Sequence, residues 1–442
     1  MRCNMSTPEV ALKSPRSNYR WWSMLLVCAA IAISYVDRVN VGVAAPSIMK
    51  EFGLTPAQMG VLMSAFFWSY VACILPIGVL LNRIGSKMIM FYSCLGWGLV
   101  TMATALVTGF QSLFAARVLL GAAESSSFPT SARVVSVWIP KQERTVASAA
   151  FDSCARVGSA FAPPLIVWVI IHYNWKLSFV VTGLLAVLFS GIWLRYYHEP
   201  EKHPKVTESE LAYIRQKQIV ESNGNSTTTN AIPLFKLFTY RRINLMCFGF
   251  FMYIYFWTTF NLWVPSYLVQ AKGFDLKAMG FAAMYPYIAG LAMEMIGAWS
   301  FDRWVRAGAS LNTVRRTAMG IGMTGAGISI YLTVYATNPA MIIFWLCSAM
   351  GWCSVGAASV WAITVDVAPV GQVGIVASAQ GAIGNLGAIL SPLVTGYLAT
   401  TKWGYNGAFL VLCVSAGLSA LAYLLNDYNR PVVPRKSAIA AC

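Results

Sequence analysis

Residues 31–40 read IAISYVDRVN, and they lie inside an apolar stretch that runs from about residue 22 to residue 45. An apolar stretch of this length is enough for one transmembrane helix. It carries two opposite charges side by side, Asp37 and Arg38. Each charge near the middle of a bilayer costs about 2.5–3.5 kcal/mol on insertion scales, so charges there are usually paired or functional. This segment alone is consistent with a structural ion pair and with a site that handles charged cargo or protons.

The composition indicates a membrane protein. Apolar residues make up 57% and charged residues 11% of the 442 residues, and the mean hydropathy is +0.60. Soluble domains are about a quarter charged. A net charge of +16 would suit a nucleic-acid partner only if the basic residues covered a solvated face, and most of them lie in short gaps between apolar stretches. The ten cysteines have no metal-binding or disulfide spacing, so we expect no metal and no cofactor.

Apolar stretches of spanning length recur along the chain in two sets of six, separated by a polar segment at residues 198–240. We predict an all-α membrane protein with twelve transmembrane helices in two six-helix bundles, residues 22–197 and 241–426. The tails are residues 1–21 and 427–442. The individual spans are predicted at about residues 22–45, 57–81, 88–108, 112–138, 147–171, 175–197, 243–270, 276–300, 316–335, 339–366, 371–398 and 404–425.

The basic residues are distributed unequally between the two sides of these spans. Most lie in both tails, in the linker and in alternate gaps, whereas the other side holds only Lys50, Lys176, Lys272, Lys277 and Lys402. By the positive-inside rule, both termini are cytoplasmic. We expect a multi-pass protein of a bacterial inner membrane. Within the linker, Thr207 and Glu210 form a capping-box pattern that predicts a short surface helix at about residues 207–220.

The two halves resemble each other at an offset of 220 positions. Met59-Gly60 corresponds to Met279-Gly280, Gly78 to Ala298, and Asn82-Arg83 to Asp302-Arg303. Several matches at one offset indicate duplication. Two six-helix repeats with a site at their interface are typical of secondary transporters.

Residues 78–87 read GVLLNRIGSK and resemble the signature loop of the major facilitator superfamily between its second and third helices. The family usually has Asp where this chain has Asn82, which weakens the charge of the cytoplasmic latch that the loop is thought to form. The resemblance implies the major facilitator fold. It also assigns the latch to Gly78, Asn82, Arg83, Asp302 and Arg306.

More specific motifs resemble the anion:cation symporter branch, near the transporters for galactonate, glucarate and hexuronates. They begin with YVDRVN at residues 35–40 and continue with Arg117, Gly121, Glu124 and Phe128-Pro129 in the fourth span. The others are Trp138, Pro140 and Glu143-Arg144; Trp361, Asp366 and Pro369; and Gly384-Asn385, Gly387 and Pro392. The resemblance implies that Asp37, Arg38, Arg117 and Glu124 form a proton-coupling set, and it favours Tyr35, Tyr70, Trp361 and Asn385 as substrate-binding residues.

The residues themselves support a site of this kind. Arg117 and Glu124 are seven positions apart on one helix, which places them on one stripe about 10 Å apart along the axis. Because isolated buried charges are costly, we expect them to face Asp37 and Arg38 or a wet cavity. A purely structural network that joins the first and fourth spans is the other reading. We predict that Arg38 binds a substrate carboxylate, since its planar fork can hold both oxygens, and thereby frees Asp37 to take a proton.

Asp152 and Arg156 lie one helical turn apart in the fifth span. They are either a self-neutralised pair or, in the functional reading, a site where Arg156 meets the second carboxylate of a diacid. Glu294 lies in the eighth span without a partner in sequence, and proton-carrying and structural roles are both open. The neutral residues that could line a site, besides those named above, are Tyr255, Trp257, Asn261, Tyr285, Ser359 and Gln380.

These observations favour a proton-coupled secondary transporter that imports an organic anion, such as a sugar acid, by alternating access. The alternative cargo is another carboxylate, such as the dicarboxylate tartrate or the aromatic acid phthalate, and sodium coupling stays open. The chain lacks a phosphate-binding GxxxxGK[ST] loop, and its three histidines lie at span ends or in the linker, which argues against an ATP-driven pump and against an enzyme. A substrate-sensing receptor would typically carry an added signalling domain, which we do not expect here, so this reading is disfavoured. The three buried arginines disfavour a drug exporter with cationic cargo. We expect a monomer in the bilayer.

Overall fold

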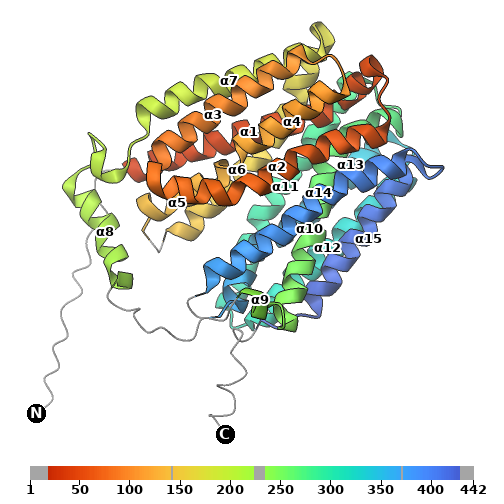
Figure 1. Ribbon diagram of the computed structural model, residues 1–442. Coiled ribbons are helices and arrows are strands. Elements are labelled where there is room, and N and C mark those ends of the chain that lie inside the picture. The colour runs from red at the N-terminus through yellow and green to blue at the C-terminus, as the bar shows by residue number, and fades with distance from the viewer. Residues whose placement is uncertain (1–17, 141–142, 223–233, 370–371, 429–442) are drawn as a thin grey trace, which may run out of the picture.

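The structure, a computed structural model, describes residues 18–140, 143–222, 234–369 and 372–428. Across these residues the regular structure is helical, and the long helices form two groups (Figure 1). The first group contains α1 (Tyr19–Phe52), α2 (Pro56–Ile84), α3 (Ser86–Ala103), the 3-10 turn η1 (Thr104–Leu106), α4 (Phe110–Glu124), α5 (Ser127–Trp138), α6 (Arg144–His172) and α7 (Trp175–Tyr196). The second contains α10 (Arg241–Gln270), α11 (Leu276–Arg306), α12 (Leu311–Tyr335), α13 (Pro339–Val367), α14 (Val373–Ala399) and α15 (Gly404–Leu424).

In the part of the chain that the structure describes, eleven helices are long and apolar enough to cross a membrane. The prediction that the fourth span, residues 112–138, is one continuous helix is wrong. Two shorter helices, α4 and α5, of 15 and 12 residues, occupy that segment. The other eleven predicted spans each correspond to one long helix, and five of these helices (α1, α2, α6, α11 and α12) are several residues longer than predicted.

The break between α4 and α5 has a local cause. Pro129 has no backbone N–H, and its ring crowds the carbonyl four residues earlier, so it disfavours a continuous helix here. The neighbouring serines bond back to carbonyls at the end of α4: Ser125 Oγ donates to the Ala122 carbonyl at 2.7 Å, and Ser127 Oγ to that of Glu124 at 2.8 Å. Glu124 is therefore the last residue of α4, held in the interior where the helix ends.

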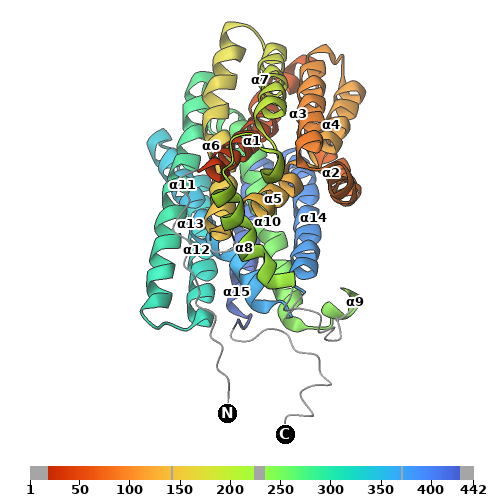
Figure 2. The ribbon, with the colours of Figure 1, turned by 90° about the vertical axis from the view of Figure 1, so that its left-hand side faces the viewer.

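The two ends of the molecule differ. The connection between the groups contains the 3-10 turn η2 (Pro200–Lys202) and the helices α8 (Glu208–Ser222) and α9 (Leu234–Leu237). α1 begins beside α8, and the end of α15 lies beside the start of α10, where Arg242 pairs with Asp427. We call this the linker end and the other the opposite end (Figures 1 and 2).

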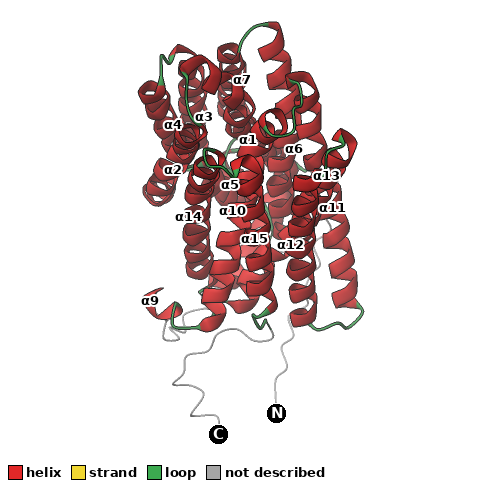
Figure 3. Ribbon diagram, turned by 90° about the vertical axis from the view of Figure 1, so that its right-hand side faces the viewer, coloured by secondary structure: helices red, strands yellow, loops and turns green. Residues whose placement is uncertain are grey.

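The hydrophobic core joins the two groups mainly toward the opposite end. One cluster of buried residues includes Val43, Met59 and Val167 from the first group together with Leu262 and Met279 from the second. A separate cluster fills the first group at its linker end, with the residues Met24, Trp97, Trp138, Trp193 and Ile214 among its members. Across the interface α2 packs on α14, α6 on α11 and α1 on α10 (Figure 3).

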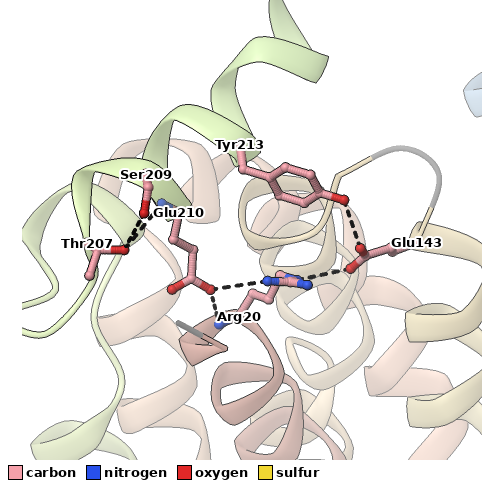
Figure 4. A network of polar contacts seen from close by, with 6 residues as sticks. All are labelled: Arg20, Glu143, Thr207, Ser209, Glu210 and Tyr213. Atoms are coloured by element: carbon pink, nitrogen blue, oxygen red, sulfur yellow. Dashed lines mark hydrogen bonds and ion pairs between the residues drawn. The ribbon is translucent and has the colours of Figure 1, made fainter. Parts of the chain in front are cut away.

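The linker helix α8 is held against the first group by buried polar contacts (Figure 4). Arg20 Nε lies 3.0 Å from a Glu143 carboxylate oxygen, and the Arg20 backbone N–H donates to Glu210 at 3.2 Å. The Tyr213 hydroxyl donates to Glu143 at 3.1 Å. Thr207 Oγ1 accepts the backbone N–H of Glu210 at 3.4 Å, as the capping pattern predicts. The start of α1, the loop before α6 and the helix α8 thus form one unit.

Candidate functional site

The charged pair at the centre of the first group joins α1 to α4. Arg38 Nε lies 2.5 Å from a carboxylate oxygen of Glu124, and the side chains are 14% and 0% exposed. The sequence placed these two charges in different helices and predicted that they would face each other or a wet cavity, and the structure brings them together. α4 ends at Glu124 and α5 begins at Ser127, so the break between the two helices lies directly at this contact.

Aromatic rings surround the Arg38 guanidinium. Its central carbon lies 5.0 Å from the ring centres of Tyr35 and Tyr70, 5.1 Å from Phe66 and 6.0 Å from Phe128. Cation–π contacts of this kind stabilise a desolvated cation without neutralising its charge. Arg38 is therefore held in place by rings and by one carboxylate, and a second anion could compete for that carboxylate's position.

Asp37 and Arg117 are buried, and several of their polar atoms have no hydrogen-bond partner among the described residues. Neither carboxylate oxygen of Asp37 has a hydrogen-bond partner among the described residues, and the same holds for two nitrogens of Arg117, Nε and Nη1. Asp37 does not bond to Arg38, because adjacent side chains on a helix point in different directions. Glu124 and Arg117 are the charged groups that act on Asp37, and the hydroxyls of Thr182 and Thr101 also lie beside it. Unsatisfied buried charges are expensive, so these two residues are candidates for a functional role.

A cavity of about 140 Å³ lies between the two groups of helices. Its first-group side is lined by Tyr35, Phe128, Asp152, Ala155 and Arg156, and its second-group side by Phe250, Tyr253, Ile254, Trp257, Ala357 and Val360. Two of these rings, Tyr35 and Phe128, also contact Arg38. The cavity therefore connects Arg156 on one wall with the ring cage of Arg38.

Arg156 has contacts with both groups. Its Nη1 lies 3.4 Å from Asp152 Oδ2 on the same helix and 2.8 Å from Glu294 Oε2 on α11. Its Nε donates to Ser354 Oγ of α13 at 3.3 Å, and its guanidinium lies 5.0 Å from the Trp257 ring centre. The sequence pairs Arg156 only with Asp152, and the structure adds Glu294 from the other half.

The opposite end of the interface is tightly packed. A Cβ on Gly60 would lie 2.4 Å from the Pro392 carbonyl oxygen, and one on Gly42 would lie 2.7 Å from that of Leu262. Ser64 Oγ donates to the Ile389 carbonyl at 2.7 Å. Backbone therefore meets backbone across the interface on the far side of the cavity from the linker end, and only glycine leaves enough room at these positions.

The predicted neutral residues lie mostly outside this cavity. Asn261 accepts from Ser159 at 3.4 Å and from Tyr287 at 3.1 Å, which makes it a polar contact between the halves. Asn385 Nδ2 donates to the Gly381 carbonyl of its own helix, and Gln380 accepts from Thr364. Ser359 and Tyr255 are buried in the second group, whereas Tyr285 is 45% exposed. The side chain of Trp361 lies outside the described residues. Among the neutral candidates whose side chains are described, Tyr35 and Trp257 line the cavity.

Among the described residues, no hydrogen bond or ion pair joins the predicted latch residues of the first group to those of the second. Asn82 Oδ1 accepts from Arg133 of α5 at 2.9 Å, within the first group. Arg306 Nε donates to the backbone carbonyl of Asp302, within α11. A Cβ on Gly78 would meet no described atom within 4 Å. At the linker end, the latch residues thus make no contact between the groups like the one between Gly60 and Pro392.

Sequence reasoning missed Phe250, Tyr253 and Ile254 as lining residues. With Trp257 they fall at positions i, i+3, i+4 and i+7 of α10, a spacing that defines one helix face. The spacing can be seen in the sequence, but other faces of this largely apolar helix also carry apolar residues at helical spacing, so the pattern does not single out the face that lines the cavity. The partnership of Arg156 with Glu294 left no local signal, because the two residues belong to different halves.

The sequence matches the Major Facilitator Superfamily over residues 27–314 and 307–439. The chain belongs to this superfamily. It is 33% identical over 427 residues to the D-galactonate transporter of Escherichia coli O6:H1, covering 95% of this chain and 98% of the relative. It is 32% identical over 425 residues to a probable galactarate/D-glucarate transporter of Bacillus subtilis, covering 93% and 92%.

The fold agrees with this membership. The crystal structure of a bacterial homologue of the human lysosomal transporter Spinster, in an inward-facing and unoccupied conformation, matches with a TM-score of 0.73 at 16% identity, covering 93% of this chain and 97% of that chain. The protein is therefore a major facilitator transporter with many membrane-spanning helices, and not an enzyme.

Proposed function

We propose that this major facilitator protein imports an organic anion, of the sugar-acid class, together with protons. The observation that carries the proposal is the Arg38–Glu124 pair inside a cage of four rings beside the interfacial cavity. A guanidinium at that position attracts an anionic cargo, and a carboxylate already bound to it can exchange with the cargo. The relatives' names, which refer to galactonate, galactarate and glucarate, support the same class of cargo.

In the proposed cycle a substrate carboxylate takes the place of Glu124 on Arg38. Glu124 is fully buried, so its ionised form would then lose its partner in an apolar environment, and the carboxyl takes up a proton. Asp37 is the second proton site and Arg117 the cation that both acids share. Tyr35 and Tyr70 hold the Arg38 side chain, and Arg156, Trp361 and Asn385 complete the proposed substrate-binding set. We expected Asp37 to be the acid that Arg38 releases, and the observed pairing favours Glu124 in that role.

We propose that α4 and α5 together form a twelfth span, with Glu124 at the break. The two bundles are then residues 22–197 and 241–426, joined by a linker at 198–240, with both tails on the cytoplasmic side of a bacterial inner membrane. The arrangement of basic residues supports this orientation.

The linker end is then cytoplasmic. The tight packing at Gly60 and Gly42 and the separated latch residues are consistent with a state open to the cytoplasm, one of two that alternating access requires. The transporter works as a monomer in this proposal.

The experiment is uptake by purified protein in proteoliposomes with an imposed pH gradient. D-Galactonate and D-glucarate are the first substrates, and tartrate and phthalate the second pair, since Trp257 and Tyr253 in the cavity wall could accommodate an aromatic acid. Accumulation of a sugar acid that collapses with a protonophore supports the proposal. Uptake that requires Na⁺, or accumulation of organic cations instead of acids, would contradict it.

A further inference from the structure

A second ion pair, Arg156 with Glu294, crosses the interface beside the cavity, and the exchange at Arg38 does not use it. Glu294 Oε2 lies 2.8 Å from Arg156 Nη1, and the two side chains are 9% and 3% exposed. The pair joins α6 of the first half to α11 of the second. From this arrangement we propose that Glu294 is a further proton-carrying residue, released when a second substrate carboxylate binds Arg156, and that the substrate is therefore a dicarboxylic acid. This inference rests on the proposed function.

The two carboxylates on Arg156 are not equivalent. Asp152 is 36% exposed and lines the cavity, whereas Glu294 is nearly buried. If a substrate carboxylate displaces both, Asp152 can be solvated, but an ionised Glu294 would be left buried without a counter-charge. Breaking such a pair by removing one partner is strongly unfavourable, so Glu294 has to take up a proton.

The groups around Glu294 leave no other cation to replace Arg156 among the described residues. Those that act on it or on Arg156 are Asp152 of α6, Tyr253 of α10 and Cys353 of α13, together with the hydroxyls of Ser153 and Ser354. None of these carries a positive charge. The charge balance at Glu294 therefore depends on Arg156 alone.

Formal charges indicate that a dianion needs protons to bind here. Three arginines (Arg38, Arg117 and Arg156) face four acids (Asp37, Glu124, Asp152 and Glu294), which sum to −1 when all are ionised. A dicarboxylate would bring the site to −3, an amount of buried charge that is prohibitive without neutralisation. Protonation of Glu124, the acid on Arg38, and of Glu294, the acid on Arg156, removes two of these three negative charges.

The geometry also fits a substrate with two acidic ends. Tyr35 lines the same cavity as Arg156, and its ring lies 5.0 Å from the Arg38 guanidinium. Both arginines are among the charges that act on Tyr35. Tyr35 and Phe128 separate Arg38 from the cavity, so an extended acid meets Arg156 with one carboxylate and reaches Arg38 with the other once the Tyr35 ring moves aside.

The test compares two six-carbon probes, D-galactonate with one carboxylate and D-glucarate with two. In proteoliposomes, reversal potentials give the number of protons moved per substrate. The wild type should move one more proton with D-glucarate than Glu294→Gln does, and the two proteins should not differ with D-galactonate, which leaves Glu294 on Arg156. Arg156→Gln should weaken D-glucarate binding about tenfold more than it weakens D-galactonate binding, as expected for a charge-assisted contact that only the dicarboxylate makes.

Controls separate folding from coupling. Glu201→Gln is a matched change at an exposed ion pair with Arg215, and its proton ratio should equal that of the wild type. Glu294→Asp keeps a titratable carboxyl and should retain the extra proton, so it replaces Glu294→Gln as the test if the latter does not fold. Three results would overturn this inference and leave the proposed function standing. They are an unchanged number of protons per D-glucarate in Glu294→Gln, loss of the extra proton in Glu294→Asp, and equally weakened binding of both acids in Arg156→Gln. If the wild type moves neither acid with protons, the proposed function fails as well.

Discussion

Arg38 of α1 and Glu124 of α4 form a 2.5 Å ion pair, although Arg38 stands next to Asp37 in the sequence. The pair lies where α4 ends, and the interruption that places it there comes from Pro129 and its preceding serines. The rings around Arg38 stabilise its charge from other directions, and the carboxylate of Glu124 is an anionic contact that another anion can replace. This relationship underlies the proposed exchange of substrate for carboxylate.

Glu124→Gln should separate substrate exchange from proton coupling. The amide can still accept a hydrogen bond from Arg38 but cannot take up a proton, so counterflow of unlabelled against labelled substrate should persist. Net uptake driven by a pH gradient should fall at least about tenfold, equivalent to a barrier increase of about 1.4 kcal/mol. Counterflow and net uptake, measured on the same proteoliposomes, provide the comparison. Equal loss of both would point to a structural role.

Arg38→Lys should impair binding although it keeps the charge. Lysine cannot hold both oxygens of a carboxylate and is more strongly hydrated, so we expect the apparent Kd for a sugar acid to rise about tenfold or more. The measurement is a thermal-shift titration with D-galactonate and D-glucarate. Arg133→Lys, at an exposed contact with Asn82, is the matched control and should bind with the affinity of the wild type. An Arg38→Lys protein with unchanged affinity would contradict the assignment.

Gly60→Ala should disfavour the closed opposite end. Its Cβ would lie 2.4 Å from the Pro392 carbonyl oxygen, a backbone atom that cannot move aside cheaply. In a cysteine-free background, a cysteine at Ser64 should therefore react faster with an impermeant thiol reagent applied from outside. Gly191→Ala on α7, where a Cβ meets no described atom within 4 Å, is the control and should leave the reaction rate unchanged. Slower labelling in Gly60→Ala would reverse the assignment of the closed end.

Arg20→Met should destabilise the unit formed by α8 and the start of α1. The substitution removes the Arg20 guanidinium from Glu143 and Glu210 and keeps the backbone N–H contact to Glu210, and removing one partner of a buried pair costs about 3–5 kcal/mol. We expect a lower Tm and faster proteolysis of the linker. Arg215→Met breaks the exposed pair with Glu201, where the expected loss is about 0–1 kcal/mol. Similar effects of the two substitutions would mean that the buried network does not hold α8.

The linker contacts should weaken in mild acid. His203 lies against Tyr19, Trp138 and His198, and burial, followed by the charge of His198, lowers its pKa below the usual 6.5. The unfolded linker therefore binds more protons than the folded one. The contribution of His203 to stability is fully present above about pH 6.5 and is lost as the pH falls through the lowered pKa. Linker proteolysis against pH tests this, and His203→Phe should abolish the step; a step that remains in His203→Phe would assign it to another group.

The sequence was sufficient for much of the fold. Long apolar runs with charges confined to the gaps predict the order of the helices, because a bilayer permits few other spanning structures. It was also sufficient to bring Arg38 and Glu124 into one site, since neither could remain in lipid alone. Arg156 was likewise recognised from its depth in an apolar helix.

The remainder depended on how helices meet. The break at Ser125–Ser126 was missed because prolines are common in intact membrane helices, and only the serine contacts distinguish this one. Glu294 was left unpaired because its partner lies in the other half of the chain. Asn385 was favoured by resemblance, but its side chain bonds to its own helix in this structure, so its proposed role requires a different conformation.

The most direct measurement of the central proposal is uptake of a sugar acid into proteoliposomes under an imposed pH gradient, with the wild type and Glu124→Gln side by side. We predict that the wild type concentrates D-galactonate or D-glucarate against its gradient and that Glu124→Gln only equilibrates it. Concentrative uptake by Glu124→Gln at the wild-type rate would contradict the account.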